Sequence, residues 1–229
     1  MRKVFVMGDI HGAYRALIQC LERSDFDYDN DHLICLGDVC DGWPETKRCI
    51  DELLRITHLS YILGNHDTWT LEWMKTGYIE NIWYVQGGEA TIDSYQAREV
   101  PASHIALLER ALPYLILEDR LFVHAGIDVG VPIELQDNDT FLWDRTLART
   151  ALQDHRSGAR RTLTRFSEVY VGHTPIPFPE PIFASGVWLM DTGAGWQGVL
   201  SMRDINSGEI ITSDSVPSLY PGVAGRGMR

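Results

Sequence analysis

The pentapeptide Gly8-Asp9-Ile10-His11-Gly12 places a carboxylate and an imidazole in one short turn bounded by glycines. It follows the apolar run 4–7 and precedes the amphipathic run 14–21, a pattern that predicts a strand, a tight turn and a helix. If the turn keeps the period of the strand, Asp9 and His11 project to the same side and make half of a metal site. The alternative for this stretch alone is an ordinary strand-to-helix turn, in which Asp9 caps the helix.

Further polar residues recur where other predicted strands end. The set contains carboxylates, an amide and imidazoles: Asp9, His11, Asp38, Asp41, Asn65, His66, His124 and His173. This mixture of ligands suits Mn²⁺, Fe or Zn²⁺ better than Mg²⁺ or Ca²⁺. Because one ion needs fewer ligands, the set would hold two ions about 3.5–4 Å apart through a shared carboxylate. Such a pair of ions supports in-line displacement at phosphorus.

Hydrophobic patterning predicts the elements that position the first of these residues. Apolar runs at 4–7, 33–36 and 60–63 predict strands, and the segments 13–22 and 44–55 between them predict helices. Leu17, Ile18 and Leu21 are expected to form the buried stripe of the first helix, and Pro44 suits the first turn of the second. The resulting β-α-β-α-β order implies parallel strands with right-handed crossovers. The glycine-bearing turns then lie along one edge of one sheet, where α/β proteins place their sites.

The rest of the chain predicts a more mixed arrangement. Residues 68–112 are expected to be helical with a break at Gly87-Gly88, and 114–118 pairs with 121–124 as a hairpin. Helices are predicted at 140–150 and 156–166, and strands at 168–172, 187–191, 199–205 and 209–212. We therefore expect one α/β domain over residues 1–229, a four-layer sandwich of two mixed β-sheets flanked by helices. The Gly- and Pro-rich composition of 217–229 favours a mobile tail.

Composition narrows the classes of partner. The chain has 229 residues, 45% of them hydrophobic, and a formal net charge of −12, so it repels nucleic-acid polymers and anionic membranes overall. A phosphorylated substrate would need local positive charge from metal ions or clustered arginines. The four cysteines form no C-x-x-C pair, which favours reduced thiols. No run has the length of a signal-peptide core or a membrane span, so we expect a cytoplasmic protein.

Taken in order, these motifs resemble the signature of the calcineurin-like metallophosphoesterases. The matching segments are Gly8-Asp9-Ile10-His11-Gly12, Gly37-Asp38-Val39-Cys40-Asp41-Gly42, Gly64-Asn65-His66-Asp67, His124-Ala125-Gly126 and Val171-Gly172-His173-Thr174. Within that superfamily they are similar to the phosphoprotein phosphatase branch, especially its small bacterial and phage members. Asp191-Thr192-Gly193-Ala194-Gly195 also looks like the late strand-end segment of bacterial members. The resemblance implies a metallophosphoesterase fold.

The resemblance also implies a role for each residue. One metal ion would be held by Asp9, His11 and Asp38. The other would be held by Asp38, Asn65, His124 and His173, with Asp38 bridging. A hydroxide between the ions would attack phosphorus, because two cations acidify bound water. His66 would protonate the departing alkoxide, while Asp41 would orient His66 and keep it protonated. The expected cofactors are two manganese ions, with iron or zinc as alternatives.

The second motif departs from the family pattern. It usually reads G-D-x-x-D-R-G, with the arginine on the phosphate, whereas Gly42 and Trp43 follow Asp41 in this chain. A bidentate arginine–phosphate contact is strong and geometrically exacting, so its loss puts a standard phosphoserine or phosphothreonine preference in doubt. Trp143-Asp144-Arg145 resembles the W-x-R segment of the family. Arg145 is therefore the expected phosphate-binding arginine, alongside Asn65 and His66.

Two further features could serve substrate binding. Beyond Arg145 the chain carries a basic island, whose members are Arg149, Arg156, Arg160, Arg161 and Arg165. The island either supplies the attraction that Gly42 cannot or forms a solvated helix face. Trp43 and Trp143 flank site segments and either wall the pocket or serve as ordinary core anchors.

Three functions follow from these observations. The first is a two-metal phosphoesterase of serine/threonine phosphatase type that hydrolyses phosphate monoesters. The second is a nucleotide hydrolase that resembles the bis(5'-nucleosyl)-tetraphosphatases, or a broader mono- and diesterase, because Gly42 leaves room for a larger leaving group. The third is a non-catalytic relative that binds metal or phosphorylated partners. The intact pair His66 and Asp41 argues against the third, because a binding protein needs no general acid.

Overall fold

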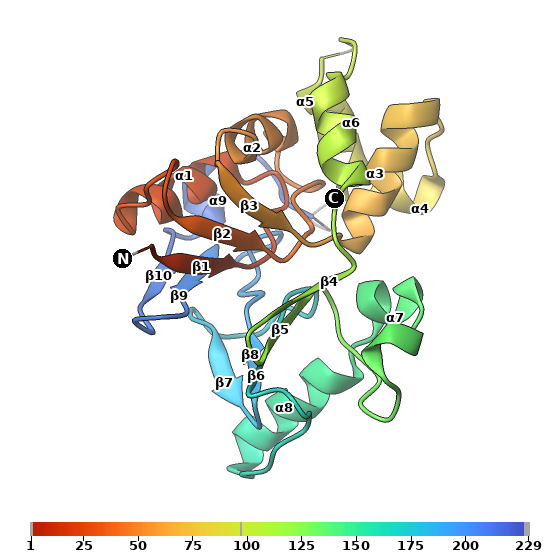
Figure 1. Cartoon of the computed structure of the whole chain (residues 1–229). Helices are drawn as coiled ribbons and strands as arrows, with labels where there is room; N and C mark the ends of the chain where they lie inside the picture. The colour runs from red at the N-terminus through yellow and green to blue at the C-terminus, as the bar shows by residue number, and fades with distance from the viewer. Residues whose placement is uncertain (1, 97, 227–229) are drawn as a thin grey trace.

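Two five-stranded β-sheets pack face to face in the computed structural model, with helices on their outer faces (Figure 1). The structure describes residues 2–96 and 98–226. The first sheet has the strand order β10-β9-β1-β2-β3 and the second has β4-β5-β6-β8-β7. The predicted α/β sandwich of two mixed sheets is therefore confirmed.

The first sheet combines the start and the end of the chain. Its strands are β1 (Val4–Met7), β2 (His32–Cys35), β3 (His58–Tyr61), β9 (Ser201–Asp204) and β10 (Ile210–Thr212). The strands β1, β2 and β3 are parallel, as the β-α-β-α-β order predicted, and β9 joins β1 antiparallel. Its outer face is covered by α1 (Tyr14–Arg23), α2 (Thr46–Leu53) and α9 (Val216–Leu219) (Figure 1).

The second sheet is built from the middle of the chain. Its strands are β4 (Tyr114–Leu117), β5 (Arg120–Val123), β6 (Glu168–Val171), β7 (Ile182–Ala184) and β8 (Val187–Leu189). The strands β5, β6 and β8 run parallel to one another. The short strand β7 was not predicted from the sequence. The helices beside this sheet are η2 (Ile133–Leu135), α7 (Asn138–Trp143) and α8 (Thr146–Ser157).

The alternation of side chains along each strand divides the core. In β1, Phe5 and Met7 join the cluster under α1 and α2, whereas Val6 faces the second sheet. In β6, Val169 joins the cluster under α8, whereas Tyr170 faces the first sheet. The period of two therefore gives every central strand two buried faces, as the continuous apolar runs indicated.

Short helices between β3 and β4 form a cap beside the carboxyl ends of the first sheet (Figure 1). They are α3 (Asn65–Thr76), α4 (Asn81–Trp83), the π-helix η1 (Tyr84–Gly88), α5 (Glu89–Ser94) and α6 (Ala102–Glu109). The predicted break lies at Gly87, whose φ of 117° no helix accommodates. Among the described residues, no helix is long and apolar enough to cross a membrane.

Two predicted helices differ from the structure. The segment 140–150 is not one helix, because α7 ends at Trp143 and Asp144 is extended. Asp144 Oδ1 accepts a hydrogen bond from the backbone N of Thr146, the first residue of α8, at 2.5 Å. The segment 156–166 is not a helix either, because Gly158, at φ 72°, ends α8 in the left-handed conformation.

Smaller differences concern helix boundaries and buried faces. The helix α2 begins at Thr46, two residues after Pro44. The buried residues of α1 include Ala16, Leu17, Cys20 and Leu21, whereas Ile18 is half-buried. Within the predicted tail 217–229, Tyr220, Gly225 and Arg226 pack against the protein, 221–224 are exposed, and 227–229 lie outside the described residues.

Candidate metal centre

The carboxyl ends of parallel strands from both sheets converge on one buried cluster. Asp9 and His11 follow β1, Asp38 and Asp41 follow β2, and Asn65 and His66 follow β3. From the second sheet, His124 follows β5 and His173 follows β6. All eight are buried, although each can ionise or form hydrogen bonds. Buried groups of this kind are stable only when they are paired or bound to metal.

Backbone strain sets the directions of four of these side chains. His11, Asp38, Asp41 and His173 have φ values between 48° and 72°, in the left-handed region that non-glycine residues avoid. Each such residue costs about 1–3 kcal/mol, and such strain concentrates at functional sites. His11 therefore does not keep the period of β1. The turn itself brings its Nε2 to 3.9 Å from Asp9 Oδ2 and 3.8 Å from Asp38 Oδ2.

Two histidines have their tautomers fixed by backbone carbonyls. His11 Nδ1 donates to Cys40 O at 3.0 Å, and His124 Nδ1 donates to Leu36 O at 2.8 Å. Because a carbonyl can only accept, each Nδ1 carries the proton and each Nε2 faces the cluster. This arrangement is typical of metal-ligating histidines. His124 Nε2 lies 3.5 Å from Asp38 Oδ2 and 3.0 Å from Asn65 Oδ1.

His173 completes the cluster from the second sheet. Its Nε2 is buried and has no hydrogen-bond partner, which is costly unless a ligand satisfies the atom. Its backbone N donates to both oxygens of Asp9, at 3.1 and 3.0 Å. A Cβ at Gly172 would collide with the Asp9 carboxylate. The glycine that precedes His173 is therefore required for this close approach.

Two groups of ligand atoms could each hold an ion, Asp9–His11–Asp38 and Asp38–His124–His173. Within each group the ligand atoms all lie within 4.8 Å of one another. Asp38 belongs to both groups. Carboxylate oxygens and imidazole nitrogens are the donors that manganese, iron and zinc accept, so these residues fit a dinuclear centre.

Charges of opposite sign offset the cost of burial within the cluster. Burial raises the pKa of Asp9 well above its usual range, and the nearby Asp191 adds to the effect. Burial alone would raise the pKa of Asp38 too, but His124 and His66 hold it well below its usual range. Burial would lower the pKa of His124, yet Asp38 raises it to about 9. Positive charge is therefore stabilised at the point where Asp38 meets His124.

His66 and Asp41 form a pair beside this cluster. His66 Nδ1 lies 2.7 Å from Asp41 Oδ2, and both side chains are buried. Asp41 also accepts from Trp83 Nε1 at 2.8 Å and from Thr91 Oγ1 at 2.7 Å. Thr70 Oγ1 adds a longer bond of 3.3 Å. The carboxylate is therefore fixed from four sides, and it in turn fixes the ring of His66.

The structure places Arg145 next to the second ligand group. The break between α7 and α8 lets its Nη1 donate to His173 O at 2.9 Å. Burial lowers the pKa of Arg145, as does the neighbouring Arg149. Trp143 is 42% exposed and its ring lies 6.0 Å from that of His173, so it walls the site. Trp43 does not, because it is buried and stacks on Tyr220 with ring centroids 5.1 Å apart.

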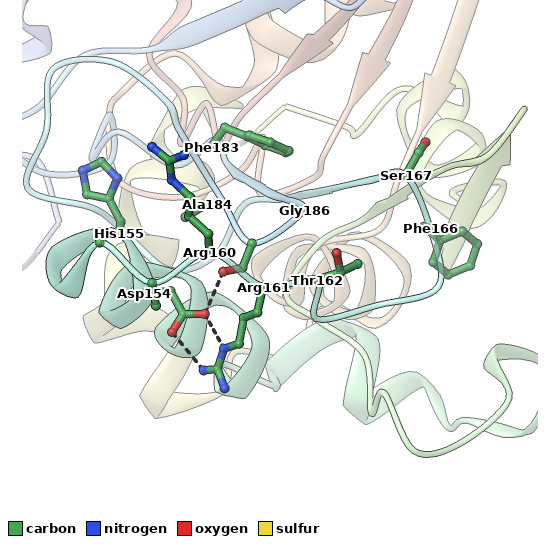
Figure 2. Close-up of a pocket in the computed structure, with 13 residues that line it drawn as sticks. Asp154, His155, Arg160, Arg161, Thr162, Phe166, Ser167, Phe183, Ala184 and Gly186 are labelled. Carbon is green, nitrogen blue, oxygen red and sulfur yellow. Dashed lines mark hydrogen bonds and ion pairs between the residues drawn. The ribbon is translucent and has the colours of Figure 1, made fainter.

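Most of the basic island lies elsewhere. Arg160 and Arg161 line a cavity of about 710 Å³ with Ser167 and Gly186, which precede β6 and β8 (Figure 2). Because the candidate ligand His173 follows the opposite end of β6, the two places are roughly 20 Å apart. Arg161 is paired there with Asp154, at 2.7 and 2.9 Å (Figure 2). Arg160 and Arg161 therefore lie too far from the candidate ligands to contact a phosphate bound there, and attraction of the substrate by the basic island stays a hypothesis.

Several residues around the site had no role assigned from the sequence. Asp67 accepts from the backbone N of Asp38 at 2.9 Å and holds the turn after β2. Trp83 and Thr91 support Asp41 from the cap, and no local pattern marks them. Arg226 lies 3.0 Å from His11 Nε2, although it belongs to the predicted mobile tail.

Comparisons with known proteins agree with this geometry. The model of the calcineurin-like phosphoesterase family matches residues 2–190. Serine/threonine-protein phosphatase 1 of Salmonella typhimurium is 26% identical over 212 residues, covering 89% of this chain and 92% of that protein. An asymmetrical bis(5'-nucleosyl)-tetraphosphatase of Geobacillus thermodenitrificans is 26% identical, with 95% of each chain covered.

A solved protein serine/threonine phosphatase from Saccharomyces cerevisiae is similar in structure. It superposes with a TM-score of 0.63 over 93% of this chain and 80% of that one. The two sequences are only 11% identical, so the likeness concerns the fold alone.

Proposed function

Because the chain belongs to the calcineurin-like phosphoesterase family, we propose that it hydrolyses phosphate monoesters at a centre of two divalent ions. Membership of this family makes the protein a hydrolase of phosphoric esters. Relatives named serine/threonine-protein phosphatases support a phosphate monoester as the substrate. The observation that carries the proposal is the position of Asp38, which is common to two buried ligand groups beside the His66–Asp41 pair.

The proposed ligands divide between two ions. One ion would be held by Asp9, His11 and Asp38. The other would be held by Asp38, Asn65, His124 and His173. When bound, such ions supply Lewis acidity toward phosphoryl oxygens and activate water near neutral pH. We propose manganese as the metal, with iron or zinc as alternatives that have the same donor preference.

The remaining polar residues would act on the substrate itself. His66 would donate a proton to the departing oxygen, because Asp41 holds its Nδ1 and leaves Nε2 for the substrate. Arg145 would bind the phosphoryl group with Asn65, since its guanidinium lies beside His173 and forms no ion pair within the described chain. Trp143 and Trp69, whose ring centroids are 5.3 Å apart, would form walls of the substrate pocket.

A nucleotide substrate is the second candidate. The tetraphosphatase relative covers nearly the whole chain, and exposed Trp143 offers a face on which a base could stack. Activity of manganese-reconstituted protein on a phosphoserine peptide, a dinucleoside tetraphosphate and an aryl diester separates the candidates. We expect the highest kcat/KM on the peptide, whereas a higher kcat/KM on the dinucleotide would favour the second candidate. If the protein hydrolyses none of these three substrates and no aryl monophosphate, it would be a non-catalytic relative.

We also propose that residues 1–229 form a single catalytic domain that works in the cytoplasm. Both sheets contribute ligands to one site, so neither half would be functional alone. The four cysteines are free and buried, which suits a reducing compartment.

A further inference from the structure

The end of the described chain is anchored beside the metal cluster. After α9, the ring of Tyr220 stacks on Trp43, and Gly225 packs against the same indole. Arg226 N donates to Gly195 O at 3.0 Å, and Gly195 in turn lies against the ring of His11. Backbone and side-chain contacts therefore hold this segment on the first-sheet side of the site.

The side chain of Arg226 continues into the cluster. Its Nη1 lies 3.0 Å from His11 Nε2 and its Nη2 donates to Gln86 Oε1 at 3.4 Å. The guanidinium stacks over the ring of Trp196, with its carbon 5.1 Å from the centroid. Its Nε is buried without a hydrogen-bond partner. Among the described residues, the side-chain hydrogen-bond partners of this cation are thus a neutral imidazole and an amide.

The path of this side chain crosses Gly42. A Cβ at Gly42 would lie 2.9 Å from Arg226 Cγ, and one at Gly87 would lie 3.3 Å from the same atom. Both glycines have φ above 100°, which disfavours any other residue there. Gly42 is the position at which the resembling family carries its phosphate arginine. The absence of that side chain provides the space that Arg226 occupies.

We propose that Arg226 is a substrate-binding residue that supplies, from the far end of the chain, the phosphate contact missing at Gly42. The inference rests on the proposed function. A lone pair of His11 that binds metal cannot also accept from Arg226, so the guanidinium is then available to phosphoryl oxygens. Arg226 approaches from the side of His11, and Arg145 approaches from the side of His173. The two cations would therefore hold one phosphoryl group between them.

The test compares Arg226→Met, Arg226→Lys and the wild-type enzyme, all loaded with manganese and checked for metal content. Arg160→Met is the matched control, because it removes the same charge from the distant cavity. The direct readout is the Kd of inorganic phosphate by calorimetry, which needs no turnover. KM and kcat on 4-nitrophenyl phosphate are measured in parallel.

We expect Arg226→Met to bind phosphate about 10- to 100-fold more weakly, as for the loss of a hydrogen bond to a charged group. The phosphate affinity of Arg226→Lys should lie between those of Arg226→Met and the wild type, because an ammonium group keeps the charge but lacks the two parallel N–H donors of a guanidinium. Arg160→Met should match the wild type, and metal content should be equal in all four proteins.

Three results would overturn the inference. The first is an unchanged phosphate affinity in Arg226→Met. The second is a tighter phosphate affinity in that variant, which would make Arg226 a residue that occludes the site. The third is the absence of phosphate binding by the wild type. Failure of the proposed function is a separate outcome. In that case the wild type binds phosphate through Arg226 but hydrolyses no ester.

Discussion

Replacing His66 with asparagine removes the proposed proton donor and keeps a polar side chain in its place. Asp41 would lose one partner, at 2.7 Å, but would still accept from Trp83 and Thr91. The stability cost is therefore that of one hydrogen bond to a charged group, about 1.5–3 kcal/mol. The ligand groups do not include His66, so metal binding should persist.

The loss of catalysis should depend on the leaving group. General acid catalysis contributes about 10²–10⁴ in rate, or roughly 2.7–5.4 kcal/mol of activation free energy. An alcohol leaves poorly without a proton, whereas an acidic phenol leaves well as its anion. The kcat of His66→Asn should therefore fall by the full factor on phosphoserine peptides and little on activated aryl phosphates.

The assay measures kcat for a series of phosphate esters together with metal content and thermal stability. The matched control is His104→Asn, since His104 is also buried and its Nε2 lies 2.9 Å from Asp51 Oδ1, in another part of the chain. It should lose comparable stability and keep kcat. An equal fall on every ester, or loss of both metals from His66→Asn, would refute the division of roles.

Other predictions follow from the same geometry. Asp38→Asn should abolish hydrolysis and lower the manganese content of both positions, which elemental analysis measures; full occupancy would contradict the shared carboxylate. The double variant Arg160→Ala and Arg161→Ala should leave kcat/KM unchanged within about twofold, because both residues line a separate cavity; a drop of tenfold or more would contradict that placement. Burial raises the pKa of Cys20 to about 12, so about one thiol in 10⁴ is ionised at pH 8. An aromatic disulfide reagent should therefore modify Cys20 only after denaturant is added. Rapid reaction of Cys20 in the native protein would show that the surroundings of α1 open.

The sequence predicted best the features that arise from local pattern. Each of the first strands is a short apolar run followed by glycine and a polar residue, and chain order alone makes them parallel. Their ends therefore had to meet, which brings Asp9, Asp38 and Asn65 together. Strand boundaries followed the apolar pattern less closely. The strand β3 begins and ends two residues before the predicted segment 60–63. Ile62 is apolar, but it lies outside β3 and forms only an isolated bridge with Leu112.

The features that could not be predicted depend on contacts between distant segments. Thr91 Oγ1 donates to Asp41 Oδ1 across 50 residues, and although a break at Gly87 was predicted, no local pattern indicates this contact. Arg226 meets His11 across 215 residues, and its glycine-rich surroundings suggested a mobile tail. Arg160 and Arg161 are close in sequence to Arg145, but α8 carries them to the other end of β6.

The two-metal site is best checked by a crystal structure of the protein with manganese, phased on the anomalous signal of the metal. A centre of two ions that share Asp38 should give two manganese peaks about 3.5–4 Å apart, with Asp38 between them, Asp9 and His11 on one, and His124 and His173 on the other. A single peak, or peaks that leave Asp9 and His173 without metal, would contradict it.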